Sequence, residues 1–156
     1  MAETPASFDS APIDMDSYIP GLITVLGNKL TSQTSIMYRR QFGVGAIEWR
    51  ILSLLATMAD ATSSDVSRAS GLDKAAIARN LGTLQRKGAV TMTDDPEHGR
   101  RRLVTLTASG RRLHNKILIS ARKNERQLLS CFTKAQSTSL TRLLQRLRAH
   151  LRDSEK

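Results

Sequence analysis

Two helix-start signals follow each other closely in the middle of the chain, and they constrain its fold more than any other feature. Thr62 stands three residues before Asp65, which is the acidic form of the capping box at a helix N-terminus. Gly71 can end that short helix in the left-handed conformation. Asp73 then caps a second helix, which Gly88 ends. Two short helices joined by a glycine-bearing turn are the sequence form of a helix-turn-helix.

The hydrophobic period changes from helical to alternating after the second of these helices. Residues 89–93 and 103–106 have the alternation of short strands, and Pro96 and Gly99 lie in the turn between them. Three consecutive arginines close that turn, Arg100, Arg101 and Arg102. The pattern predicts a β-hairpin with a basic tip directly after the helix-turn-helix.

Long helical patterns flank this central module at residues 17–43 and 46–58, at 107–132 and at 134–151. The predicted fold is therefore mainly α with a small β-hairpin: a winged helix-turn-helix over 45–106 with long N- and C-terminal helices. The two small central helices cannot cover the apolar faces of the first and last helices together. We therefore expect residues 17–43 and 107–152 to form a dimerisation region of one domain, 17–152. The alternative is that the terminal helices close on their own monomer.

Charge is unevenly distributed along the 156 residues. The chain has 24 Lys and Arg against 14 Asp and Glu, a formal net charge of +10. Residues 1–16, which we expect to be a disordered acidic arm, carry −4, whereas residues 68–116 carry +7 from eleven basic and four acidic residues. A concentrated basic segment attracts a polyanion such as DNA, although a solvated surface is the alternative for a charge run alone.

The exposed face of the second central helix offers groups suited to a DNA major groove. Arg79 can donate two parallel hydrogen bonds to guanine, and Asn80 can pair with adenine. Lys74 and Lys87 suit phosphates, and the arginine tip suits a narrow minor groove. The alternatives are an ordinary amphipathic helix with a solvated basic face and an exposed turn. The predicted DNA-binding residues are Ser63, Lys74, Ala75, Arg79, Asn80, Thr83, Arg86, Lys87, Arg100, Arg101 and Arg102.

The order of these elements and several segments resemble the MarR family of transcriptional regulators. The segments are 72–81 (LDKAAIARNL), 84–90 (LQRKGAV), 95–97 (DPE) leading to Arg100, 103–110 (LVTLTASG) and 48–52 (EWRIL). The resemblance covers about residues 18–152. The chain departs from the family at His98, where an acidic residue is frequent, so an acid–arginine pair at the wing tip is not implied.

The resemblance implies a homodimer that binds a pseudo-palindromic operator on double-stranded DNA. Such a protein is usually a repressor of a catabolic, efflux or stress operon, released by a small aromatic carboxylate, phenolic or aryl-thioester ligand. Family members bind such ligands between the first, second and fifth helices. The residues that could line this site are Met37, Tyr38, Arg40, Trp49, Arg50, Met58 and His114. Trp49 as plain core and His114 as a structural histidine are the alternatives.

Other functional classes have little support in the sequence. The three histidines lie on the hairpin tip and on two different helices without a nucleophile motif, so we expect neither an enzyme nor a metal site, and no cofactor. The N-terminus lacks a secretory signal and no apolar run could span a membrane, so the cytoplasm is the expected compartment. Two alternatives remain open: a non-specific architectural DNA-binding protein, and a thiol-redox-sensing regulator that uses the single cysteine, Cys131.

Overall fold

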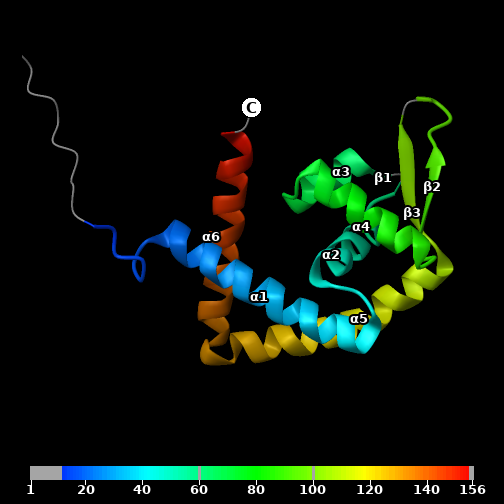
Figure 1. Cartoon of the computed structure of the whole chain (residues 1–156). Coiled ribbons are helices and arrows are strands. Elements are labelled where there is room, and N and C mark those ends of the chain that lie inside the picture. Colours follow the sequence, from blue (N-terminus) through cyan, green and yellow to red (C-terminus); the bar gives the residue numbers. More distant parts are fainter. Residues whose placement is uncertain (1–11, 60, 100, 155–156) are drawn as a thin grey trace, which may run out of the picture.

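A computed structural model describes residues 12–59, 61–99 and 101–154 (Figure 1). The fold is mainly helical with one small sheet, as the sequence predicts. Most of the expected acidic arm, residues 1–11, lies outside the described residues. The elements in chain order are α1 (Ile19–Phe42), α2 (Ala46–Leu55), β1 (Ala61–Thr62), α3 (Ser63–Ser70), α4 (Lys74–Arg86), β2 (Val90–Asp94), β3 (Arg102–Leu106), α5 (Ala108–Leu128), a 3₁₀ turn (Leu129–Cys131) and α6 (Lys134–Asp153).

Both predicted helix starts of the central module are capped by the residues that the sequence indicates, Thr62 and Asp73. The backbone N–H of Asp65 donates to Thr62 Oγ1 at 3.2 Å, and the backbone N–H of Thr62 donates to Asp65 Oδ2 at 3.0 Å. Gly71 ends α3 with φ of 68°. Asp73 Oδ1 accepts from the N–H of Ala76 at 2.7 Å, which fixes the start of α4. The helix-turn-helix is confirmed in its two caps and in the turn between them.

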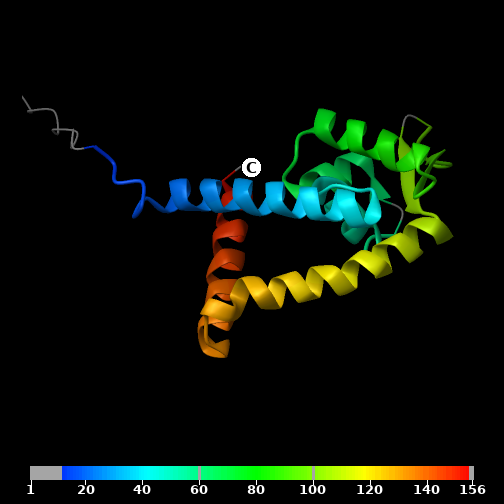
Figure 2. The ribbon, with the colours of Figure 1, turned by 60° about the horizontal axis from the view of Figure 1, so that its bottom comes forward.

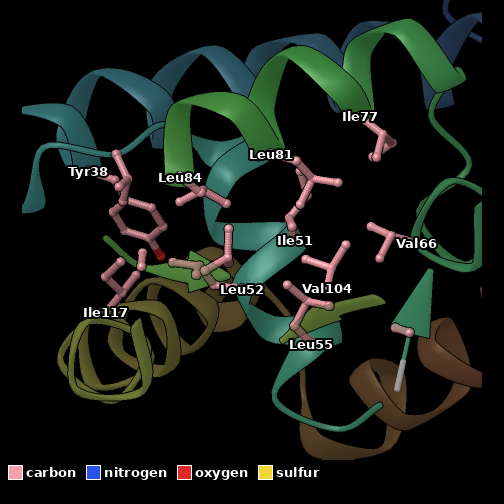
Figure 3. Close-up of a cluster of buried hydrophobic side chains, with 14 residues drawn as sticks. Tyr38, Ile51, Leu52, Leu55, Val66, Ile77, Leu81, Leu84, Val104 and Ile117 are labelled. Carbon is pink, nitrogen blue, oxygen red and sulfur yellow. The ribbon is translucent and has the colours of Figure 1, made fainter. Parts of the chain in front are cut away.

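The core lies where α4 packs on α2, with α3, α5 and the sheet around them (Figure 3). Ile77, Leu81 and Leu84 form the buried stripe of α4, as the helical spacing predicts. They meet a matching stripe of α2 and single apolar residues of the surrounding elements. The buried partners include Tyr38, Ile51, Leu52, Leu55, Val66, Val104 and Ile117. This core fixes the face that α4 presents to solvent.

The sheet has three antiparallel strands in the order β1-β3-β2, one more than the expected hairpin. β2 and β3 pair with Val90 opposite Leu106 and Asp94 opposite Arg102, and they form the wing. β1 pairs Ala61 with Val104 on the other edge of β3. A strand of two residues that ends on the helix cap Thr62 leaves no alternating pattern in the sequence, which is why it was not predicted.

The three long helices extend away from the central module (Figures 1 and 2). α2 ends at Leu55, earlier than the expected residue 58, and α5 gives way to a 3₁₀ turn before Phe132. No side chain of α6 is buried, and no other described element packs extensively against this helix. Among the described residues, no helix is both long and apolar enough to cross a membrane.

Candidate nucleic-acid interface

The face of α4 opposite the core is exposed and combines small with basic side chains. Lys74, Ala75, Ala78 and Arg79 are all exposed, and the helix stands at the outer surface of the module (Figure 2). The side chain of Arg79 forms no hydrogen bond or ion pair with any other described residue. The alanines leave room for a groove to approach the helix backbone. A base edge or phosphate can therefore reach Arg79 without displacing a protein partner.

Three other predicted DNA contacts on α4 already use part of their hydrogen-bonding capacity. Asn80 Nδ2 donates to the carbonyl oxygen of Ala76 at 2.8 Å, and Thr83 Oγ1 donates to that of Arg79 at 3.1 Å. The guanidinium of Arg86 donates to Thr83 Oγ1 at 3.1 Å. One N–H of the Asn80 amide is engaged along the helix, and the amide has a second N–H and a carbonyl oxygen, the two kinds of group that a pairing with adenine uses.

Lys87, which the sequence predicts to contact a phosphate, forms two hydrogen bonds within the protein. Its Nζ donates to Glu48 Oε1 at 2.8 Å and to the carbonyl oxygen of Gly43 at 2.6 Å. The carboxylate partner is buried, with 8% of the Glu48 side chain exposed. The sequence pattern could not show this pairing because the two partners are far apart along the chain.

A cleft of about 600 Å³ separates the start of α3 from the wing. The predicted residues Ser63, Arg101 and Arg102 line it, together with Ala78 of α4. Hydrogen bonds from Thr62, foremost that of its hydroxyl, hold the pKa of Asp65 in this cleft below its usual value. Ser64 and Arg68 also line the cleft and were not predicted, since only the fold brings the exposed side of α3 against the wing.

The turn of the wing is held by Asp95. Its Oδ1 accepts from the backbone N–H groups of Glu97, at 2.9 Å, and His98, at 3.3 Å. Its Oδ2 lies 3.6 Å from Nδ1 of His98. At the base of the turn Arg102 Nε lies 3.7 Å from Asp94 Oδ1, so one of the three arginines has an exposed carboxylate partner. Arg100 lies outside the described residues.

A second cavity, of about 520 Å³, lies between α1, α2 and α5. Of the predicted ligand residues, Met37, Tyr38 and Trp49 line it. His114 stacks on Trp49 with ring centroids 5.1 Å apart and an angle of 23° between the planes. Burial raises the pKa of the Tyr38 hydroxyl, against a smaller opposite effect of the hydrogen bond with Asn124. The other lining residues are Leu30, Gln33, Thr34, Ala121, Asn124, Glu125, Gln127 and Leu128.

The remaining predicted ligand residues lie outside this cavity. Arg40 lines a neighbouring groove on α1 with Met37, and neither Arg50 nor Met58 lines the cavity between α1, α2 and α5. Arg50 is exposed, and Met58 packs against the core. The polar residues Asn124 and Glu125 were missed because α5 gives no sign in its sequence of which turn faces α1.

Comparison with known proteins gives a consistent result. The sequence profile of the MarR family matches residues 42–101. A curated relative, an uncharacterized HTH-type transcriptional regulator of Bacillus subtilis, is 29% identical over 153 residues, which cover 96% of this chain and 87% of the relative. A MarR/EmrR family transcriptional regulator from Acinetobacter has a crystal structure that matches with a TM-score of 0.83 at 33% identity, covering 90% of this chain and 99% of that one.

Two structures of lower identity share the fold and were solved with bound molecules. One is the DNA complex of MepR from S. aureus, with a TM-score of 0.77 at 18% identity over 86% of this chain and 98% of that one. The other is CouR from Rhodococcus jostii bound to p-coumaroyl-CoA, with a TM-score of 0.74 at 20% identity over 87% of this chain and 95% of that one.

Proposed function

Because this chain belongs to the MarR family of winged helix-turn-helix transcriptional regulators, we propose that it is a homodimeric repressor released from its operator by a small aromatic ligand. The operator is pseudo-palindromic, and the protein has no catalytic role. The observation that carries the DNA-binding part is the exposed face of α4, whose Arg79 has no partner among the described residues.

In this proposal α4 lies in the major groove and Arg79 reads a base edge. A bidentate arginine–guanine contact uses both acceptors of guanine, and an exposed guanidinium without a protein partner supports that role. Lys74 and the backbone N–H groups at the helix start hold phosphates. The arginines of the wing enter the adjacent minor groove. The other proposed contacts are Ser63, Ala75, Asn80, Thr83, Arg86, Arg100, Arg101 and Arg102.

The unpaired apolar faces support a dimer. Leu144 of α6 is 49% exposed and Leu22 of α1 is 37% exposed, and each belongs to a row of exposed apolar side chains on its helix. A single chain rarely exposes contiguous apolar faces of this length, and a second copy can cover them by two-fold symmetry. The large exposed apolar residues of these two helices are Ile19, Leu22, Ile23, Val25, Leu26, Leu30, Ile36, Leu143, Leu144, Leu147 and Leu151.

The cavity between α1, α2 and α5 is the site proposed for the ligand. Trp49 and Tyr38 supply aromatic surface, and Asn124 with Gln33 supplies hydrogen-bonding groups. Of the three ligand classes implied by the family, a phenol fits this lining best. The described lining contains one carboxylate, Glu125, and no Lys or Arg, so a bound carboxylate group would be buried without a partner charge.

Binding to DNA tests the first half of the proposal. Duplexes would be selected by the wild-type protein from a random-sequence library, and fluorescence anisotropy would compare the selected duplex with a scrambled one at physiological salt. We expect a specificity ratio of at least about 10³, typical of specific regulators. A ratio near one would favour an architectural DNA-binding protein and contradict the repressor.

Intrinsic fluorescence tests the second half, because Trp49 is the single tryptophan of the chain. A matched series of p-cresol, benzoate and benzylamine would be titrated while the emission of Trp49 is followed. We expect the phenol to change the emission at a lower concentration than the carboxylate and to weaken binding to the selected duplex. A series that leaves both signals unchanged would contradict the ligand site.

A further inference from the structure

The C-cap residue of α4, Lys87, is tied to the corner between α1 and α2 by two short hydrogen bonds, and a third holds that corner together. The carboxylate of Glu48 accepts from the backbone N–H of Gly45 at 2.6 Å through one oxygen and from Lys87 Nζ at 2.8 Å through the other. Lys87 Nζ also donates to the carbonyl oxygen of Gly43 at 2.6 Å. One lysine thus joins the C-cap of α4 to both ends of the loop between α1 and α2.

The burial of Glu48 makes it the fixed partner of this ion pair, and Lys87 the partner that is held in place. Its side chain is 8% exposed, whereas that of Lys87 is 37% exposed. A buried carboxylate holds its partner more firmly than an exposed one because water cannot replace the missing hydrogen bond. The same carboxylate closes the first turn of α2, so it cannot move with Lys87 without opening that turn.

A second contact holds Gly88, the residue after the C-cap. Thr107 Oγ1, which caps α5, also donates to the carbonyl oxygen of Gly88 at 2.6 Å. The end of α4 is therefore held between the α1–α2 corner and the start of α5. The beginning of α4 is held differently: Asp73 caps the helix through its own chain, and Ser67 Oγ of α3 donates to the carbonyl oxygen of Leu72 at 2.6 Å.

We propose that Lys87 and Glu48 are positioning residues. Their ion pair fixes the C-terminal end of α4 relative to the corner between α1 and α2, in the position that sequence-specific contacts with DNA bases require. This inference rests on the proposed role of α4 as the reading helix. Lys87 acts through the protein and contributes no phosphate contact. Loss of the pair lets the end of α4 move, so base contacts weaken while sequence-independent phosphate contacts persist.

The competing explanations make opposite predictions. If Lys87 binds a phosphate, its removal lowers the slope of log affinity against log salt by about 0.9 for that phosphate. If Glu48 only neutralises a lysine that would otherwise bind DNA, its removal frees Lys87 and strengthens binding. In the positioning role, removal of either partner weakens binding to the selected duplex and leaves the salt slope unchanged.

The experiment measures the affinity of full-length variants for the selected and the scrambled duplex at four salt concentrations. For Lys87→Met and Glu48→Gln we expect about a tenfold loss on the selected duplex and less than a twofold change on the scrambled one. The double variant should be no weaker than either single variant, since both remove the same ion pair. Lys87→Arg keeps a cation for Glu48 and should stay within about threefold of wild type. Lys116→Met, which removes an exposed charge from α5, is the matched control and should change neither affinity.

Thermal unfolding of each variant shows which proteins are folded. If Lys87→Met does not fold, the affinities of Glu48→Gln and Lys87→Arg for the selected duplex test the positioning role. Glu48→Gln should then bind that duplex more weakly than Lys87→Arg. A smaller salt slope for Lys87→Met, stronger binding by Glu48→Gln, or unchanged affinity in both would overturn the positioning role. A wild-type protein that binds the selected and scrambled duplexes equally would instead overturn the proposed function, and that comparison uses no variant.

Discussion

Gly110 packs directly against the backbone of Ala89, so closely that a Cβ atom at Gly110 would overlap the carbonyl oxygen of Ala89. This packing seats the first turn of α5 on the corner between α4 and β2. The N–H of Thr107 donates to the same carbonyl oxygen at 3.1 Å, so the oxygen cannot move away from an added methyl group. The orientation of the long helix relative to the DNA-binding module depends on this position having no side chain.

Gly110→Ala should therefore destabilise the protein. Overpacking of this kind costs about 1–3 kcal/mol, which urea unfolding followed by circular dichroism would detect. Gly82→Ala is the matched control, because a Cβ there meets only Arg86 Nη1 at 3.7 Å and alanine favours a helix. Equal stability of the two variants would contradict the packing argument.

Arg79→Ala should lose about 1–3 kcal/mol of operator binding and relax base preference at one position. The measurement is competition between the selected duplex and its single-base variants. Lys74→Ala, proposed as a phosphate contact, should weaken binding to all duplexes alike. If Arg79→Ala behaves like Lys74→Ala, Arg79 does not read a base.

Replacement of Arg100, Arg101 and Arg102 by alanine should weaken DNA binding strongly and lower the salt slope by about 0.9 for each phosphate that the wing no longer neutralises. The slope is obtained from anisotropy titrations between low and moderate salt. Arg102→Ala alone should have the smaller effect, because Arg102 is already paired with Asp94. An unchanged affinity of the triple variant would show that the wing does not touch DNA.

The capping box of α3 should make part of the stability depend on pH. The pKa of Asp65 is lowered in the folded state, so its contribution is complete above the unfolded value of about 3.9 and disappears as pH falls through the folded pKa. Wild type should exceed Asp65→Ala in unfolding free energy at pH 6, and the gap should narrow as pH falls below the unfolded value. A constant gap across this range would show that the charge of Asp65 is not involved.

Leu144→Glu and Leu147→Glu should each shift the protein from dimer to monomer. A glutamate on the apolar face of α6 would have to be buried without a partner charge in the proposed interface. Sedimentation velocity would measure the change, and Gln145→Glu, on an exposed position of the same helix, controls for the added charge. A dimer that persists in both leucine variants would place the interface elsewhere.

The sequence was most informative where local chemistry decides the structure. Thr62, Asp65 and Asp73 predict the starts of their helices, because a cap depends only on residues close by in the sequence. Partners that meet only in the folded structure cannot be recognised from the sequence pattern. Lys87 reads as a solvent-exposed cation until the fold brings Glu48 beside it. Asn124 likewise reads as one polar residue among many on α5, although it lies against Met37 and Tyr38.

The α6 helix has no buried side chain of its own, which bears on how the protein is made. In the proposed dimer, a chain leaving the ribosome can complete its central module alone but must wait for a second chain before its last helix finds a partner. Its melting temperature should then rise with protein concentration.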